Sequence, residues 1–294
     1  MITIIRVLVL GLILVVSSAH AQDFQGVATY RTQQKIDIKM DSTSVGFSKE
    51  NHAMMMEMMK KQFQKTFNLS FNKEASVYKE EESLDQPQLG GGGMQIKIVG
   101  AGGGSDVLYK NTKDSRYSDQ KDTMGKIFLV KDEIKPIQWK LQAESKFIGE
   151  YQCYKATYTK QVEVFKAMSF HSDSKVKKEG EKEGEVQEDQ EREMEDRIIT
   201  AWYTPQIPIN NGPAMYQGLP GLILEVHDGK LTIICSKIVI NPEEKIEIKE
   251  PEKGKEVNQK EYTEIMDKKS KEMMERYAPK KGREGDGYHI TIGG

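Results

Sequence analysis

The stretch LILEVHDGKLTIIC, residues 222–235, constrains the fold of this chain more than any other feature. Asp228-Gly229 lies between two apolar runs, and this dipeptide favours a two-residue turn between antiparallel strands. A hairpin with these two residues in its loop places Val226 opposite Leu231. Because side chains alternate along a strand, one face then carries only apolar residues and Cys235: Leu222, Leu224, Val226, Leu231, Ile233 and Cys235. The other face is mixed: Ile223, Glu225, His227, Lys230, Thr232 and Ile234.

A proline–glycine turn introduces this hairpin. In Leu219-Pro220-Gly221-Leu222, proline fixes the second position of a β-turn and glycine accepts a positive φ at the third, which is typical of type II. Gly218 gives the chain more room on entry. We therefore predict that this turn sets the register of the strand over 222–226, on whose solvated face Glu225 and His227 can pair.

Extended segments dominate the rest of the chain. Apolar–polar alternation, or β-branched and aromatic residues, indicate strands within 24–40, 69–71, 76–78, 126–130, 137–144 and 150–165. Successive strands are joined mostly by short turns, which favours antiparallel pairing. The predicted fold class is mainly β (α+β): an antiparallel β-sheet with an amphipathic helix near each end. A curved half-barrel is one arrangement that this pattern allows.

Two segments break the strand pattern. Residues 48–67 carry apolar side chains at four-residue spacing with lysines on the other side, which predicts an amphipathic helix; the stripe is Met55, Met59, Phe63 and Phe67. Near the C-terminus, Asn258 and Glu261 have the spacing of a capping box. An apolar stripe over 262–277 follows this box, and we expect it to pack on the sheet.

The first residues have the pattern of a secretory signal peptide. Arg6 precedes an apolar run over 7–16, and Ala19-His20-Ala21 forms a small-residue cleavage site. The run is too short to span a bilayer. We therefore expect residues 1–21 to be removed and residues 22–294 to form one exported β-rich domain without a transmembrane anchor. Its location would be periplasmic, outer-membrane-associated or secreted.

Charge is unevenly distributed along the chain. Residues 172–197 are strongly acidic and poor in apolar side chains, which predicts a disordered insert. The formal net charge of the whole chain is only −2. Because no basic face is evident, nucleic acid is not an expected partner.

The chain contains two cysteines, Cys153 and Cys235. In an exported protein, a pair of cysteines favours one disulfide, which would tie the hairpin to the strand over 150–165. Two buried thiols are the alternative. A zinc site needs more Cys and His ligands than lie near either residue, so we predict no metal site and no cofactor.

Two stretches of the sequence resemble a known family. AWYTPQIPINNGPAMYQGLPGLILEV, residues 201–226, is similar to the signature of the GLPGLI family, which is named after residues 218–223. WKLQAESKFIGEYQCYKATY, residues 139–158, resembles the central segment of that family. The resemblance implies export in a Gram-negative envelope of the Bacteroidota type and a β-rich body. It implies no chemistry and no catalytic residues.

The proline-rich segment over 202–221 is the best candidate for a binding site. Apolar side chains on a proline-stiffened loop can wall a pocket or present a surface; the candidates are Trp202, Tyr203, Pro205, Met215, Tyr216 and Leu219. The expected partner is an envelope protein or a small apolar ligand. The favoured interpretation of the segment, however, is that it covers the core of its own sheet.

The predicted role is non-enzymatic binding or scaffolding, because the chain contains neither a G-x-S-x-G elbow nor an H-E-x-x-H motif. Two alternatives remain. A helical face with His52, Met55, Met56 and Met59 suits Cu(I), although methionines also fill irregular cores. A hydrolase without a recognisable motif would need a cleft with clustered acid and base residues.

Overall fold

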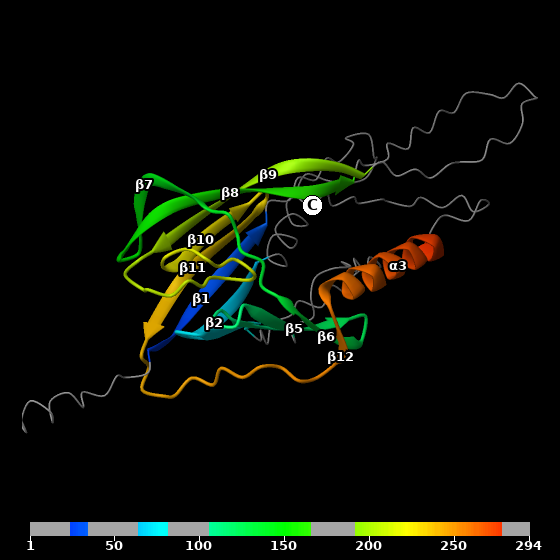
Figure 1. Ribbon diagram of the computed structural model, residues 1–294, viewed down its shortest axis with the longest axis horizontal. Helices are drawn as coiled ribbons and strands as arrows, with labels where there is room; N and C mark the ends of the chain where they lie inside the picture. The colour runs from blue at the N-terminus through cyan, green and yellow to red at the C-terminus, as the bar shows by residue number, and fades with distance from the viewer. Residues whose placement is uncertain (1–23, 35–63, 82–105, 166–191, 278–294) are drawn as a thin grey trace, which may run out of the picture.

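The computed structural model describes residues 24–34, 64–81, 106–165 and 192–277. Within these ranges twelve strands form one sheet, in the order β12-β6-β5-β4-β3-β2-β1-β11-β10-β9-β8-β7 (Figure 1). The strands are β1 (Gln25–Gln34), β2 (Lys65–Asn72), β3 (Ala75–Glu80), β4 (Val107–Asn111), β5 (Arg116–Thr123), β6 (Lys126–Glu133), β7 (Lys140–Ile148), β8 (Tyr151–Phe165), β9 (Arg192–Thr204), β10 (Leu222–Asp228), β11 (Leu231–Ile240) and β12 (Lys255–Val257).

The predicted mainly β, antiparallel fold is confirmed. Among the strands that the structure describes, only β12 runs parallel to its neighbour, β6, and every other pair is antiparallel. The sheet is open, because β7 and β12 form its two edges and do not pair with each other. Among the described residues there is no closed barrel.

The prediction of a helix near each end is only half right. The described residues contain one α-helix, α3 (Gln259–Tyr277). In the segment predicted as an N-terminal helix, residues 65–67 instead belong to β2, because Phe67, Leu69 and Phe71 continue with the two-residue period of a strand. The rest of that segment, including His52, Met55, Met56 and Met59, lies outside the described residues, as does the predicted signal peptide.

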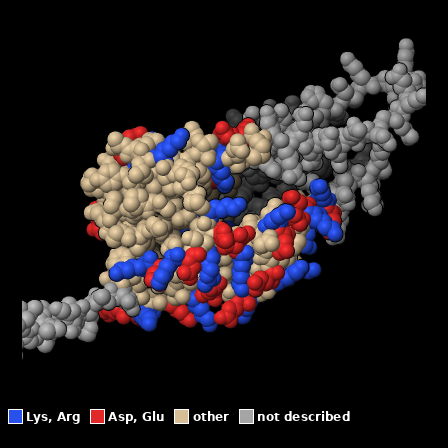
Figure 2. Space-filling view, viewed as in Figure 1, with Lys and Arg blue, Asp and Glu red and all other residues tan. Residues whose placement is uncertain are grey.

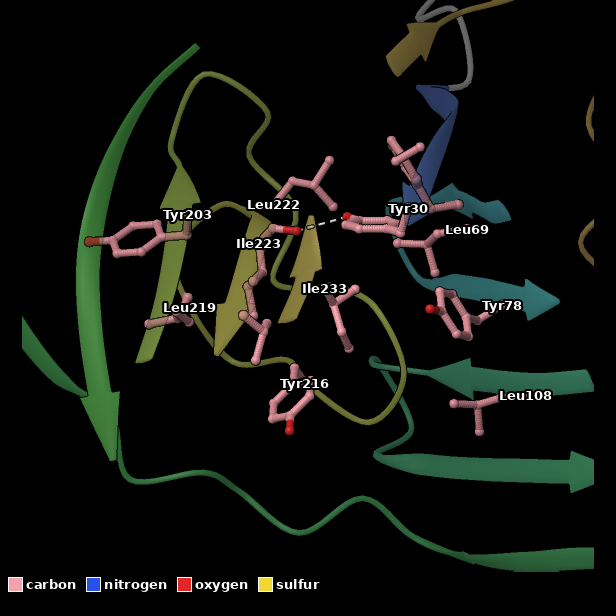
Figure 3. Close-up of a cluster of buried hydrophobic side chains, with 14 of the residues drawn as sticks. Tyr30, Leu69, Tyr78, Leu108, Tyr203, Tyr216, Leu219, Leu222, Ile223 and Ile233 are labelled. Atoms are coloured by element: carbon pink, nitrogen blue, oxygen red, sulfur yellow. Dashed lines mark hydrogen bonds between the residues drawn. The ribbon is translucent and has the colours of Figure 1, made fainter. Parts of the chain in front are cut away.

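The core follows from alternation along the central strands. In β1, Gly26, Ala28 and Tyr30 are buried, and they pair with the β2 residues Phe71, Leu69 and Phe67. Figure 3 shows Tyr30 and Leu69 beside Leu222 and Ile223 of β10 and Ile233 of β11. The Tyr30 hydroxyl donates a hydrogen bond to the Ile223 carbonyl oxygen at 2.7 Å. We call this side of the sheet the core face and the opposite side the outer face.

Helix α3 begins as the capping box predicts. The Asn258 side chain accepts a hydrogen bond from the Glu261 amide at 2.9 Å, and the Glu261 carboxylate accepts one from the Asn258 amide at 3.0 Å. Tyr262 on the helix packs edge-on against Phe128 of β6, and its hydroxyl lies 2.8 Å from the Thr123 hydroxyl. The predicted docking of this helix on the sheet is therefore confirmed at its first turns.

The predicted hairpin forms, but its register is shifted by two residues. Val226 pairs with Ile233 rather than Leu231, and Asp228 pairs with Leu231, so the loop is Gly229-Lys230 and Asp228 ends β10. An even shift keeps the side chains from Glu225 to Asp228 on their predicted faces. A β-bulge between Ile223 and Glu225 instead turns Ile223 to the core face, opposite Tyr203. The prediction that the second face of β10 is solvated is wrong as well, because Glu225 on that face is buried.

The predicted disulfide is absent, since Cys153 and Cys235 are both free thiols. Cys153 lies on β8 and Cys235 on β11, and β9 and β10 run between these strands in the sheet, whereas a disulfide needs Cα atoms within about 7 Å of each other. Burial raises the pKa of Cys153 to about 11 and that of Cys235 to about 12. Both side chains are therefore protonated near neutral pH.

Part of the predicted acidic insert over 172–197 is a strand. Residues 192–197 belong to β9, where Asp196 pairs with Gln161 and Arg197 with Lys160 of β8. Main-chain pairing with a long neighbouring strand does not depend on side-chain charge, which composition alone could not reveal. Residues 172–191 lie outside the described residues.

Candidate functional site

The proline-rich segment between β9 and β10, residues 205–221, lies against the core face. The amides of Leu222 and Ile223 donate to the carbonyl oxygens of Ile207 and Asn211, both at 3.0 Å. Four of its side chains are buried in the core of the sheet: Ile207, Ile209, Tyr216 and Leu219. In Figure 1 the segment crosses over β10 and β11. It therefore covers the core of its own sheet.

A buried lysine fixes the middle of this segment. Lys110 of β4 is fully buried, and its Nζ donates hydrogen bonds to the carbonyl oxygens of Gly212, Ala214 and Tyr216 at 2.8, 2.7 and 3.4 Å. An ammonium group has three donors, so these bonds use all of them. Burial lowers the pKa of Lys110 to about 7. No sequence signal marked this residue.

Three further contacts attach the segment to the sheet. The Tyr216 hydroxyl donates to the Asp228 carboxylate at 2.7 Å. Indole Nε1 of Trp139 donates to the Gln217 carbonyl oxygen at 2.8 Å. The side-chain Nδ2 of Asn211 donates to the Ser76 hydroxyl at 2.9 Å. Asp228 thus anchors Tyr216 instead of forming the hairpin loop.

The turn at the end of the segment is not the predicted type II turn. The Leu222 amide bonds to Ile207 rather than to Leu219, and the Gly221 amide donates to the Leu219 carbonyl oxygen at 2.8 Å. Gly221 is required for another reason: a Cβ atom there would lie 2.2 Å from the Thr204 carbonyl oxygen. Pro220 and Gly218 are exposed, and Gly218 has a positive φ of 92°.

The structure separates the six predicted binding residues. Tyr203, Tyr216 and Leu219 are buried in the core. Trp202 pairs with Glu225 and Lys155, which places it on the outer face. Only Pro205 and Met215 are exposed on the segment itself. The six residues therefore do not form one pocket.

The exposed residues of the segment instead form a surface without charge. The chain contains no Asp, Glu, Lys, Arg or His between Arg197 and Glu225, although 30% of all its residues are charged. Figure 2 shows a broad area with few charged side chains over this region. We call this surface the neutral face; its exposed residues are Pro205, Gln206, Pro208, Asn210, Met215, Gly218 and Pro220. The gap in charge is readable in the sequence and is the signal for this surface.

Met215 is held on this face by a strained neighbour. Ala214 has a φ of +48°, a left-handed conformation that non-glycine residues adopt only where the surroundings enforce it. The enforcing contacts are the bonds from Lys110 to Gly212, Ala214 and Tyr216. The Met215 side chain remains 39% exposed. The buried lysine therefore positions an apolar side chain toward solvent.

A second cluster lies on the outer face, where Glu225 and His227 do pair. Glu225 is buried and forms an ion pair with Lys146 of β7, with Nζ to oxygen distances of 2.8 and 2.7 Å. His227 bonds to Glu225 through Nε2, and its Nδ1 lies 3.2 Å from the Thr232 hydroxyl. The Lys146 ammonium also lies 4.3 Å from the centre of the Trp202 ring.

The order Thr232–His227–Glu225 matches the hydrogen-bond order of a nucleophile, a base and an acid. Acyl transfer also needs free amide donors for the oxyanion. Thr232 lies within β11, paired with His227 on one side and Gln33 on the other, so its main chain is part of the sheet ladder. The cluster is therefore best explained as a clamp that fastens β7 to β10.

No group of three or more His, Cys, Asp and Glu side chains within the described ranges is arranged to hold a metal ion. The part of the chain that the structure covers also contains no helix with the length and apolar character needed to cross a membrane.

Part of the chain matches a known protein family. Residues 139–225 match a family described as "Protein of unknown function (Porph_ging)". This match supports a family of the Bacteroidota type and does not confirm the GLPGLI assignment. The matched residues run from Trp139 to Glu225, so they include β7, β8, β9 and the whole neutral face.

The other comparisons are less informative. No curated protein matches the sequence. Among solved structures, two of PNGF-II, in space groups C2 and P21, each align with a TM-score of 0.45 and 13% identity. Each alignment covers 83% of this chain and 33% of the PNGF-II chain, so this chain spans about a third of that protein.

Proposed function

We propose that the protein is an exported, non-enzymatic binding or scaffolding protein of the GLPGLI type, which docks a protein of the bacterial envelope through its neutral face. The observation that carries this proposal is the rigid presentation of Met215 on an uncharged surface. A loop that is already ordered loses less conformational entropy on binding than a mobile one. Four independent anchors from β4, β3, β10 and Trp139 provide that order here.

A protein partner fits this surface better than a small apolar ligand. Small ligands are enclosed by apolar side chains around a cavity, whereas Ile207, Ile209, Tyr216 and Leu219 already pack into the core. What the segment offers to solvent is one methionine among prolines and uncharged polar groups. Interfaces between proteins are enriched in methionine and poor in charged side chains at their centre.

Site-specific photo-crosslinking in the producing bacterium tests this proposal. A photoreactive amino acid replaces Met215 in one strain and Lys113, an exposed residue of the turn between β4 and β5, in a second strain. We expect a discrete crosslinked envelope protein from position 215 only.

The matched control fixes the interpretation. Position 113 is more accessible, since the Lys113 side chain is 64% exposed and Met215 is 39% exposed, and it lies among charged side chains. Collision with abundant proteins would therefore label position 113 at least as strongly as position 215. The same products from both positions, or no product from position 215 in cells that export the protein, would contradict the proposal.

A further inference from the structure

Lys110 is a buried cation without a counter-charge among the described residues. The three acceptors of its Nζ are the uncharged carbonyl oxygens of Gly212, Ala214 and Tyr216. Buried charged side chains are usually paired with an opposite charge, because an unpaired one loses its hydration without compensation. No charged group in the described part of the chain contributes to the pKa of Lys110, which burial lowers to about 7. Lys110 can therefore lose its proton near neutral pH without breaking an ion pair.

Other ionisable groups lie around this position, on the strands beside β4. Residues directly opposite in a sheet point to the same side, so strand pairing identifies the groups on the side of Lys110: Glu74, Tyr78, Tyr117, Asp119 and Asp132. Burial raises the pKa of Tyr117 to about 12 and that of Tyr78 further still. Glu74 and Asp119 each form an ion pair with another lysine, and bonds from two main-chain amides lower the pKa of Asp132. The described bonds of the Lys110 ammonium go to none of them.

The acceptors of Lys110 belong to a strained turn. The Tyr216 amide donates to the Pro213 carbonyl oxygen at 3.1 Å, so Ala214 and Met215 are the central residues of a four-residue turn. A positive φ at the first central position favours glycine, but alanine occupies it here with a φ of +48°. The one ionisable side chain of the proline-rich segment is Tyr216, and burial and its bond to a carboxylate raise its pKa.

The protonation state of Lys110 determines how strongly this turn is held. An ammonium group has three N–H donors, one for each carbonyl oxygen. A neutral amine has two donors and a lone pair, so at least one of the three oxygens loses its bond and faces that lone pair. Bonds from a charged donor are also roughly twice as strong as bonds from a neutral one. Loss of the proton therefore weakens the contacts that enforce the conformation of Ala214.

We propose that Lys110 is a proton-dependent anchor of the neutral face. In its ammonium form Lys110 holds the turn and keeps Met215 toward solvent, and in its amine form it lets the turn loosen. The neutral face then binds its partner more tightly in acidic than in alkaline medium, a consequence that rests on the proposed function. The anchor itself is a property of this chain alone. The cost of burying the charge falls on the whole fold, whereas the loss of a donor falls on this turn, so the change is local.

NMR spectroscopy of the mature full-length protein tests the anchor without any partner. Lysine labelled at ¹³Cε and methionine labelled at the ¹³C-methyl group would be followed from about pH 6 to about pH 8.5. We expect the Lys110 Cε signal to titrate with a midpoint near pH 7, and the Met215 methyl signal to shift and narrow with the same midpoint. In Lys110→Gln, which keeps two N–H donors but does not titrate, the Met215 signal should not depend on pH.

Met124 is the internal control for this titration. It is 50% exposed in the turn between β5 and β6 and has a φ of +54°, but it lies at the opposite end of β5 from the residues that flank Lys110. A Lys110 side chain that stays protonated throughout, or a Met215 signal that does not follow its titration, would refute the anchor. Equal shifts of Met124 and Met215 with that midpoint would show a change of the whole fold and refute it too.

Binding measurements test the regulation separately. At constant ionic strength, the affinity of the envelope protein crosslinked at position 215 should fall at least about fivefold between pH 6 and pH 8.5 for the wild type, and less than about twofold for Lys110→Gln. Equal affinity of the wild type at both pH values would refute the regulation but not the docking surface. Failure to find any partner would refute the docking surface, and the NMR titration would still decide whether Lys110 anchors the turn.

Discussion

The two ends of the sheet are stabilised in different ways. At the end formed by β4, β5, β6, β12 and α3, charged side chains join elements distant in sequence, as in the pairs Arg116–Glu250 and Lys131–Glu256. At the end formed by β9, β10 and the neutral face, the segment between the strands is attached through main-chain carbonyl groups and buried apolar side chains. Figure 2 shows this contrast as a densely charged region beside a largely uncharged one.

The two regions suit different purposes: the charged end favours solubility, and the neutral face suits the proposed recognition of a partner. Exposed ion pairs contribute little to stability and weaken as salt rises, but they keep a surface hydrated. The neutral face has no such groups, so its order depends on buried contacts. Lys110 connects the two regions. It belongs to β4 in the charged end, and its three described Nζ hydrogen bonds all go to carbonyl oxygens of the proline-rich segment.

The largest effect should come from Gly221→Ala. The added Cβ would lie 2.2 Å from the Thr204 carbonyl oxygen, and relieving such a clash displaces main chain at the end of β9. We expect a loss of about 3 kcal/mol in the free energy of unfolding, measured with urea. Gly125→Ala, in the turn between β5 and β6, meets nothing within 4 Å and has a φ of +75°, so it should cost about 1 kcal/mol. Equal losses would remove the distinction between the two ends.

Lys110→Met should have the next largest effect. Methionine keeps most of the apolar stem but leaves the carbonyl oxygens of Gly212, Ala214 and Tyr216 without this donor, and we expect a loss of about 2 kcal/mol near neutral pH. Lys131→Met, which breaks the exposed pair with Glu256, should cost less than about 0.5 kcal/mol. Urea unfolding of both variants would measure the difference. A Lys110→Met protein as stable as Lys131→Met would show that the hydrogen bonds of Lys110 do not hold the proline-rich segment.

A smaller effect should appear as a dependence on pH. The pKa of Lys110 is about 7 in the folded protein and 10.5 in the unfolded chain, so the folded protein releases a proton that the unfolded chain keeps. This contribution to stability is complete above the unfolded pKa and is lost as pH falls through the folded pKa. Between pH 7 and 8.5 the unfolding free energy of the wild type should therefore rise by about 1.5 kcal/mol relative to Lys110→Met.

Comparing the unfolding free energy of the wild type with that of Lys110→Met cancels the contributions of the other titrating groups. Cys153 and Cys235 have raised pKa values in the folded protein, so they oppose the rise as pH increases, but they do so in both proteins. A difference between the two proteins that stays constant over this pH range would mean that the folded protein does not release the Lys110 proton.

The sequence predicted the local pattern of the fold better than its distant contacts. The hairpin over 222–235 could be recognised because its alternating pattern survives a shift of two residues. The shift itself could not, since Asp228 leaves the loop to bind Tyr216 and Arg197. In the same way, Glu225 appeared solvated because Lys146, its partner in the fold, is 79 residues away.

Aromatic and apolar residues after Trp202 pointed to a pocket in the sequence. In the structure Ile207, Ile209, Tyr216 and Leu219 of this segment instead pack into the core. Lys110 is 102 residues from Gly212, and a single lysine in a strand carries no signal of burial. The absence of charge between Arg197 and Glu225 is the sequence feature that does mark the surface.

The salt dependence of binding tests the central claim most directly. The envelope protein crosslinked at position 215 would be purified, and its affinity for the wild-type protein measured by titration calorimetry at low and high NaCl concentration. Because the neutral face carries no charge, the dissociation constant should change by less than about threefold across this range. Weakening by about tenfold or more would place the binding energy on charged side chains, and so contradict the assignment of the neutral face as the docking surface.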